Sequence, residues 1–251
     1  LFSGTPCQNA GLRNYLSQAH IDMSNLYLLD FICHGVSSPL IWKEYVAFLE
    51  KKYHRKLKAF TFRSKANGWK NVQISVQFTN DVQDMDCNKK FSYLNLYKSL
   101  YLTRPSCFHC KFTNYNRPSD ITIADFWNIG KSKPYMDDDR GVSTVLVNTE
   151  KGQKLFNAIK NEMTYEESTP EECWQPHLEY PCASPNGKDN FWQEYHGKGA
   201  DYVIEKYGKG TISSGLKNTL MPLLKKTGLY TIAGKAYGAL FGGNKSVNTR
   251  G

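Results

Sequence analysis

The sequence contains no apolar run long enough to cross a bilayer, and no signal peptide is recognisable in it. It also contains no internal repeat and no low-complexity tract, so neither a solenoid nor a disordered polar chain is indicated. The 251 residues are 40% hydrophobic, which is typical of a soluble globular protein of one large or two small domains. The first residue is not methionine, and residues 1–4 resemble the end of a strand, so we expect a fragment that lacks an upstream part.

Acidic residues are scarce towards the end of the sequence. Residues 195–251 contain nine lysines and arginines but two acidic residues, which gives them a net charge of +7 out of a total of +9. Residues 1–194 therefore carry only +2, which does not indicate a nucleic-acid-binding surface. We predict a main domain over residues 1–194 and a separate basic, partly amphipathic tail over residues 195–251.

Cysteine is present in an odd number, seven, which does not fit a secreted disulfide framework. A reducing compartment with metal ligation fits better. Cys107 and Cys110 form a C-x-x-C pair, a spacing that lets both thiolates reach one metal centre. The best candidates for two further ligands are Cys7 and Cys33. The remaining thiols have no partner at ligand spacing and are predicted to be structural or exposed: Cys87, Cys173 and Cys182.

Cys7 and Cys33 each follow an expected strand and precede an expected helix. Thr5 and Gln8 form a capping box with a proline between them, so a helix should begin directly before Cys7. Residues 26–32 are a nearly continuous apolar run, which is typical of a buried parallel strand that ends at Cys33. Because open α/β sheets bind ligands at the carboxyl edge of their strands, we expect both cysteines at one ligand-binding edge.

The rest of the pattern predicts an α/β fold with a mixed sheet, helices on both faces, an antiparallel β section and a basic helical tail at the C-terminus. Alternating apolar residues over 72–78 indicate a half-buried antiparallel strand, and Asn67-Gly68 marks the turn before it. Further strands are expected at residues 59–62, 121–127 and 143–147, and helices from Tyr93 and after Thr149. Residues 164–200 are expected to be irregular.

The motifs that contain the four candidate ligands follow one another over roughly residues 1–150 in a familiar order. They are Gly4-Thr5-Pro6-Cys7-Gln8, Asp30-Phe31-Ile32-Cys33-His34-Gly35, Arg104-Pro105-Ser106-Cys107 through Cys110-Lys111-Phe112, and Arg117-Pro118-Ser119-Asp120 through Asp125-Phe126-Trp127. In this order they resemble the C-terminal domain of the coenzyme F420 hydrogenase/dehydrogenase beta subunit family.

The resemblance implies an iron–sulfur flavoprotein oxidoreductase that passes electrons between a 4Fe-4S cluster, FAD and a second substrate, which for some relatives is the deazaflavin coenzyme. Cys7, Cys33, Cys107 and Cys110 would ligate the cluster. Similar bacterial members occur beside surface-polysaccharide biosynthesis enzymes. The implied partner is a redox protein or a small-molecule electron acceptor. We expect no nucleic-acid partner, since residues 1–194 carry little net charge. The alternative is a zinc-stabilised, non-enzymatic accessory module of a polysaccharide assembly complex, in which His34 or His109 could join the thiolates.

The predicted flavin site contains Gly4, Thr5, Arg63, Asp125 and Trp127. The turn at Gly4 and Thr5 could hold a phosphate by its N–H groups, although backbone geometry alone also explains the glycine. Asp125 and Trp127 end a strand on the same side of the pleat, and the indole could stack on the isoalloxazine or fill the core. Arg63 is a candidate partner for an anionic cofactor, as are three other cations that could equally be solvated: Lys65, Arg104 and Arg117.

The basic tail carries apolar side chains between its lysines, from Leu216 to Leu240. Such a stretch can lie at an anionic membrane surface, while a solvated or partner-docked helix is the alternative. Pro222 and Gly228 would interrupt a continuous helix. We expect a cytoplasmic protein, with peripheral contact at the inner membrane surface through this tail as a further prediction.

Overall fold

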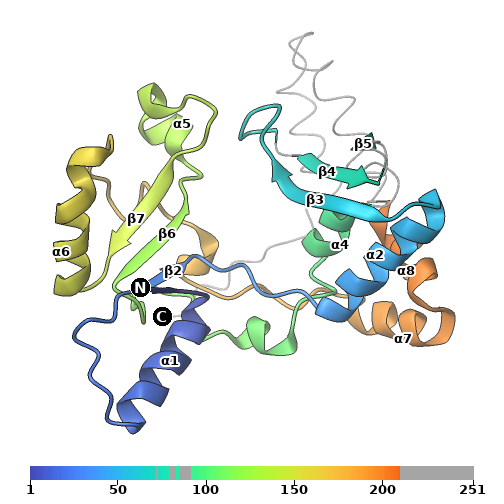
Figure 1. Ribbon diagram of the computed structural model, residues 1–251, viewed down its shortest axis with the longest axis horizontal. Helices are drawn as coiled ribbons and strands as arrows, with labels where there is room; N and C mark the ends of the chain where they lie inside the picture. Colours follow the sequence, from blue (N-terminus) through green and yellow to red (C-terminus); the bar gives the residue numbers. More distant parts are fainter. Residues whose placement is uncertain (72, 80–82, 85–91, 210–251) are drawn as a thin grey trace, which may run out of the picture.

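The computed structural model describes residues 1–71, 73–79, 83–84 and 92–209, and these residues form two β-sheets, each with its own helices (Figure 1). The larger sheet has four strands in the order β1-β2-β6-β7. Their bounds are β1 (Phe2–Ser3), β2 (Leu28–Phe31), β6 (Ile121–Asp125) and β7 (Ser143–Val147). Strands β1, β2 and β6 are parallel, and β7 is antiparallel to β6. The mixed sheet and its flanking helices confirm the predicted α/β fold.

The parallel pairing brings three loops to one edge of the larger sheet. Phe31 of β2 lies beside Ile123 of β6, so the residues that follow β2 and β6 emerge together. The loop after β1 leads to Cys7, and the loop after β2 leads to Cys33. The carboxyl edge of this sheet is therefore the place where the chain gathers its candidate ligands.

Helices α1 (Pro6–Gln18) and α6 (Glu150–Ile159) pack beside the larger sheet, and both begin at the predicted caps. Thr5 and Gln8 form the capping box, and the Thr149 hydroxyl accepts a hydrogen bond from the Gly152 N–H at 3.0 Å. The fully buried amide of Asn9 ties α1 to the sheet by donating to the Leu29 carbonyl at 3.0 Å.

The smaller sheet is antiparallel and consists of β3 (Leu57–Ser64), β4 (Gln73–Phe78) and β5 (Gln83–Asp84). Along β4, buried and half-buried side chains alternate, as the sequence pattern predicts. Four helices accompany this sheet: α2 (Pro39–Tyr53), α4 (Tyr93–Lys98), α7 (Lys188–Lys198) and α8 (Ala200–Gly208). Short helical turns complete the described chain: η1 (Pro105–His109), α5 (Ile129–Ser132), η2 (Pro134–Met136), η3 (Lys160–Glu162) and η4 (Pro176–Leu178).

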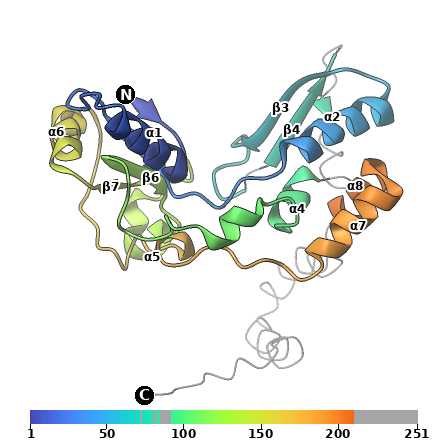
Figure 2. The same ribbon diagram turned by 90° about the horizontal axis from the view of Figure 1, so that it is seen from below.

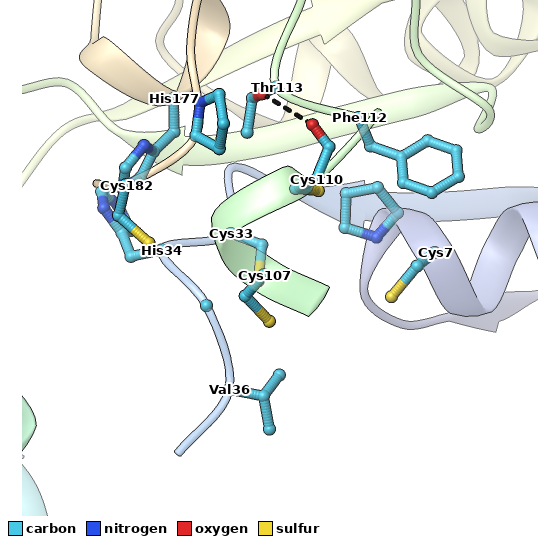
Figure 3. Close-up of a pocket in the computed structure, with 13 residues that line it drawn as sticks. Cys7, Cys33, His34, Val36, Cys107, Cys110, Phe112, Thr113, His177 and Cys182 are labelled. Atoms are coloured by element: carbon cyan, nitrogen blue, oxygen red, sulfur yellow. Dashed lines mark hydrogen bonds between the residues drawn. The ribbon is translucent and has the colours of Figure 1, made fainter. Parts of the chain in front are cut away.

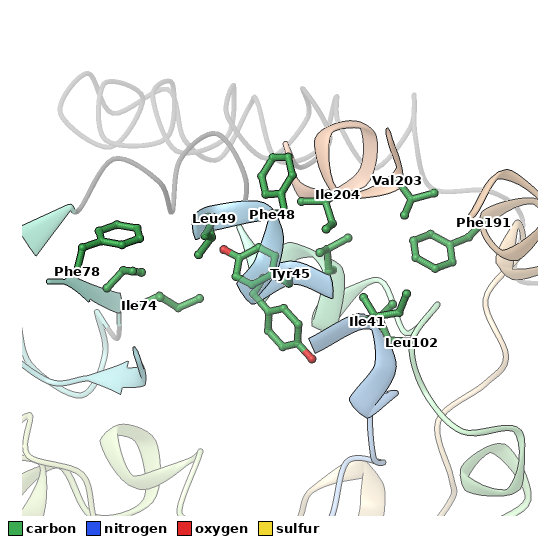
Figure 4. Close-up of a cluster of buried hydrophobic side chains, with 13 residues drawn as sticks. Ile41, Tyr45, Phe48, Leu49, Ile74, Phe78, Leu102, Phe191, Val203 and Ile204 are labelled. Atoms are coloured by element: carbon green, nitrogen blue, oxygen red, sulfur yellow. The ribbon is translucent and has the colours of Figure 1, made fainter. Parts of the chain in front are cut away.

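The main hydrophobic core lies among these four helices and the smaller sheet (Figure 4). Tyr45 and Leu49 of α2, Phe191 of α7 and Ile204 of α8 are all fully buried in it. Each such side chain contributes about 1.5–3 kcal/mol by leaving water. The C-terminal part of the described chain thus completes a core that begins near residue 40.

This packing changes one expectation and leaves others untested. Residues 164–200 were expected to be irregular, but α7 begins at Lys188, directly after Gly187, which has a φ of +86°. The helix forms there because its aromatic side chains pack into the main hydrophobic core. Helix α7 continues across the predicted boundary between the main domain and the tail at residue 194, and that boundary stays a prediction. The predicted helical tail beyond residue 209 and Cys87 lie outside the described residues. Among the helices that are described, none is both long and apolar enough to span a membrane.

The two sheets lie apart in Figure 2, and the β3–β4 hairpin contacts the loop before β7. The Trp69 N–H donates to the Asp139 carbonyl at 2.7 Å, and Arg63 of β3 pairs with Asp125 of β6 at 2.8 Å. Gly68 has φ +85°, and a Cβ there would lie 1.9 Å from a carboxylate oxygen of Asp139. Any other residue would be strained in this backbone conformation and would displace the Asp139 carboxylate.

Candidate functional site

Five cysteines line one small cavity at the carboxyl edge of the larger sheet (Figure 3). We call it the cysteine cavity; its volume is about 40 Å³, and its thiols are Cys7, Cys33, Cys107, Cys110 and Cys182. The structure therefore brings together the four cysteines that the sequence singles out and adds a fifth. Its other lining residues are mostly apolar or aromatic: Pro6, His34, Gly35, Val36, Phe112, Thr113, His177 and Pro181.

Backbone pairing brings the C-x-x-C turn to the segment that follows β2. The Ser38 N–H donates to the Leu102 carbonyl at 2.9 Å, and the Arg104 N–H donates to the Val36 carbonyl at 3.0 Å. Turn η1 then begins at Pro105, and the Cys107 N–H donates to the Arg104 carbonyl at 3.0 Å. Two segments far apart in the sequence are thus held side by side, and Cys33 and Cys107 line the same cavity.

A buried ion pair fixes the other end of the C-x-x-C turn. The guanidinium of Arg117 donates to Asp30 at 2.9 Å, and the two side chains are 1% and 0% exposed. The same guanidinium donates to the carbonyl of Phe112 at 2.6 Å and to that of Phe31 at 3.1 Å. Because Phe112 follows Cys110 and Phe31 precedes Cys33, one side chain ties both cysteine-containing segments to the sheet.

The thiols of the cavity are close enough to influence one another. Burial raises the pKa of Cys33, and the neighbouring thiolates of Cys107, Cys7 and Cys110 raise it further. Burial and then Cys107 likewise raise the pKa of Cys182. Gathering several thiolates in a partly buried cavity costs free energy unless a cation balances them. The lining residues include no carboxylate, so the possible metal donors in this cavity are sulfur and imidazole.

A second group of side chains adjoins the cavity beyond His34. The His34 ring stacks on Trp127 with ring centres 5.2 Å apart and contacts His177 edge-on at 4.5 Å. Burial lowers the pKa of His34 to about 4, with His177 adding to this effect and Asp125 opposing it. His34 is therefore a neutral imidazole at pH 7, able to donate at one nitrogen and accept at the other.

The family model that describes the C terminus of the beta subunit of coenzyme F420 hydrogenase/dehydrogenase matches residues 1–172. The chain belongs to this family. The matched stretch contains Cys7, Cys33, Cys107 and Cys110, and it ends before Cys182. Membership indicates a redox function of the hydrogenase/dehydrogenase beta-subunit type. No curated protein matches the chain closely enough to narrow this further.

The predicted flavin residues of this beta-subunit domain fall into two groups. Arg63, Asp125 and Trp127 lie around His34: the first two form the ion pair, and the third stacks on the ring. Gly4 and Thr5 directly precede α1, and the Thr5 hydroxyl lies 3.1 Å from the Sγ of Cys7, which lines the cysteine cavity. Their role in binding flavin stays a prediction.

Two details of the flavin prediction change with the structure. Trp127 does not fill the core, because its side chain is 48% exposed and lies beyond the end of β6. The N–H of Thr5 donates to the Gln8 side chain at 2.9 Å, so the capping box already uses one of the groups proposed for phosphate. Phosphate binding there would have to rely on the other N–H groups of the first turn.

Sequence reasoning missed three features of the site. Cys182 and His177 were not candidates, because no spacing in the sequence connects them to the other ligands. Arg117 was expected to face a cofactor or solvent, but Asp30 and two carbonyls bury it. The only sign of a role for Arg117 in the sequence is that it belongs to the Arg117–Asp120 motif. That motif does not indicate which residue the guanidinium binds. Cys173 is buried beside Phe126 and Ile129, as expected for a structural thiol.

Proposed function

We propose that the chain binds one 4Fe-4S cluster in the cysteine cavity and passes electrons between this cluster, a flavin and a second substrate. Cys7, Cys33, Cys107 and Cys110 are the predicted ligands. The observation that carries the proposal is that these four thiols come from three separate stretches of the chain and line one cavity without any carboxylate. Thiolate-only donor sets of this kind hold iron–sulfur clusters.

The family match favours a cluster over a single zinc ion. Within the described part of the chain, no three His, Cys, Asp or Glu side chains are arranged to hold one metal ion. A zinc ion draws four sulfurs to one atom at about 2.3 Å, whereas each thiolate of a 4Fe-4S cluster binds a different iron and so lies farther from the others. A redox family therefore makes the cluster the better candidate.

The protein's own contribution is to hold the ligands and to exclude water. Pro6, Val36, Phe112 and Pro181 give the cavity an apolar lining, which limits access of solvent and oxygen. Arg117 fixes the two segments that carry Cys33 and Cys110. When bound, the cluster would supply single-electron exchange.

The group around His34 is the proposed side for FAD and for the electron acceptor. Trp127 offers an exposed planar surface, and the guanidinium of Arg63 is 56% exposed beside it. Stacking and a nearby cation are the contacts that an anionic aromatic cofactor needs. Neutral His34 can donate or accept one hydrogen bond there. The proposal also includes the electron acceptor, which would be a deazaflavin-like molecule or a redox partner protein, and a link to polysaccharide biosynthesis. It places the protein in the cytoplasm, with membrane contact through the tail.

Anaerobic reconstitution of the chain with iron and sulfide, followed by metal, sulfide and flavin analysis, tests the proposal. We expect about four irons per chain and a brown protein with broad absorption from sulfur-to-iron charge transfer. A matched sample of Cys107→Ala should stay colourless, and Cys173→Ala should match the wild type because that thiol lies outside the cavity. Stoichiometric zinc with no iron uptake would instead support the zinc-stabilised accessory module.

A further inference from the structure

Strand β7 forms one edge of the larger sheet, and the strand at the other edge, β1, is only two residues long (Figure 1). Natural proteins protect a sheet edge by short strands, charged side chains, prolines or β-bulges. The five residues of β7 include no charged residue and no proline. The strand also pairs with β6 without a register shift, so it has no bulge. Thus β1 is protected by its shortness, whereas β7 has none of these protections.

Three residues of β7 direct their backbone hydrogen-bonding groups away from the sheet. The Asn148 N–H donates to the Asp120 carbonyl at 2.9 Å. Because such bonded pairs alternate along an antiparallel ladder, the even-numbered residues of β7 bond to β6. The N–H and C=O groups of the odd-numbered residues point outward: Ser143, Val145 and Val147. In the described part of the chain, these outward groups have no hydrogen-bond partner.

Open space borders this strand. A cavity of about 430 Å³ is lined by residues 145–148 together with residues 115–117. Helix α6 lies over the face of the sheet, since a Cβ on Gly152 would lie 2.2 Å from the carbonyl oxygen of Asp120, directly before β6. The side chain of Val145 is still 39% exposed. The described neighbours of β7 therefore leave room for another strand beside it.

Val145 also ends a row of exposed apolar side chains. Phe31 of β2 lies opposite Ile123 of β6, and Ile123 lies opposite Val145 of β7. All three side chains are exposed. The row runs across the sheet towards its β7 edge, so a strand added at this edge would extend the same apolar surface.

We propose that β7 pairs with β7 of a second copy of this chain, antiparallel and about a twofold axis at Val145, so that the two larger sheets join into one. This isologous arrangement uses the same edge of both copies. With Val145 opposite Val145 of the second copy, all three outward-directed residues find a bonding partner, whereas a register shifted by two residues leaves one unpaired. The two valines then form a β-branched cross-strand pair and connect the apolar rows of both copies.

The charges beside β7 are complementary in the same register. Arg140 lies five residues before Val145 and Glu150 five residues after it. Antiparallel pairing about Val145 therefore brings Arg140 of each copy to the end of the interface where Glu150 of the other lies. The Arg140 side chain is 89% exposed, and Glu150 is exposed as well. Such rim charges contribute mainly to the choice of partner and register.

Sedimentation equilibrium of the whole chain, with reductant to exclude disulfide-linked dimers, tests the proposal, and we expect a reversible dimer. Val145→Lys places like charges opposite each other and should weaken dimerisation about tenfold or more. The matched variant Val145→Thr keeps the β-branch and the N–H and should dimerise like the wild type. Val145→Pro should be monomeric yet folded by circular dichroism, because it removes an outward N–H and no bond to β6.

A charge exchange tests the register. Glu150→Arg would face Arg140 of the second copy and should weaken dimerisation about threefold, and adding Arg140→Glu should restore it. A double variant that stays as weak as Glu150→Arg would overturn this register. A monomeric wild type, or a dimer that Val145→Lys leaves unchanged, would overturn the pairing itself. A monomer in which the amides of Val145 and Val147 resist hydrogen exchange would show that another segment covers the edge, which also contradicts the proposal.

Discussion

Replacing Arg117 by methionine should destabilise the protein more than any surface substitution. Asp30 is 0% exposed and Arg117 is its cation partner at 2.9 Å. The second carboxylate oxygen of Asp30 has no hydrogen-bond partner in the described part of the chain. Without the guanidinium, a buried negative charge would therefore remain uncompensated.

The magnitude follows from the contacts that are lost. Breaking a buried ion pair by removing one partner costs about 3–5 kcal/mol. The carbonyls of Phe112 and Phe31 lose a charged donor as well, at about 1–3 kcal/mol for each unsatisfied group. Because these terms overlap, we expect a total loss of about 4–5 kcal/mol, a large part of the 5–15 kcal/mol that typically stabilises a protein.

Urea unfolding followed by circular dichroism measures this loss, with two companion variants. Arg63→Met removes an ion pair whose side chains are 56% and 36% exposed, so it should cost no more than about 1 kcal/mol. The double variant Asp30→Leu with Arg117→Met removes both buried charges, so it should recover part of the loss and be more stable than Arg117→Met alone. A loss below about 1 kcal/mol for Arg117→Met would refute the reasoning.

Three further predictions concern helix packing, pH and the flavin site. In Gly152→Ala the new methyl would lie 2.2 Å from the Asp120 carbonyl oxygen, so thermal unfolding should show a loss of stability of about 1–3 kcal/mol. The matched variant Gly11→Ala places its methyl where nothing lies within 4 Å, so it should raise the stability by about 0.5–1 kcal/mol. Hydrogen bonds from Lys206 and Tyr207 lower the pKa of Glu194 from 4.5 to about 2. The stability that ionised Glu194 contributes is therefore fully present above pH 4.5 and is lost as the pH falls toward 2. Glu194→Gln should make the stability of the protein less dependent on pH in this range. Trp127→Ala should weaken flavin binding about two- to tenfold by loss of stacking, measured by flavin fluorescence titration, with the unfolding midpoint little changed because the indole is 48% exposed; unchanged flavin affinity would remove Trp127 from the site.

Local chemistry explains why much of the fold could be predicted. The capping box of Thr5 and Gln8, the alternation along β4 and the apolar run before Cys33 depend on residues within one turn or one strand of each other. Such patterns specify the start of a helix or the exposed face of a strand regardless of the partner. The parallel order of β1 and β2 then placed Cys7 and Cys33 at one edge, as expected.

The amino-acid sequence by itself determined most of the elements before residue 164, the family and the four candidate thiols, because each rests on a short-range pattern or on motifs. Only the tertiary structure decided that Cys182 joins them, that Trp127 is exposed beside His34, and that α7 and α8 complete the main core. Arg117 shows the physical reason: its partner Asp30 lies 87 residues away in the sequence. Whether a side chain is buried, paired or free depends on which distant segment packs against it, and no local spacing carries that information.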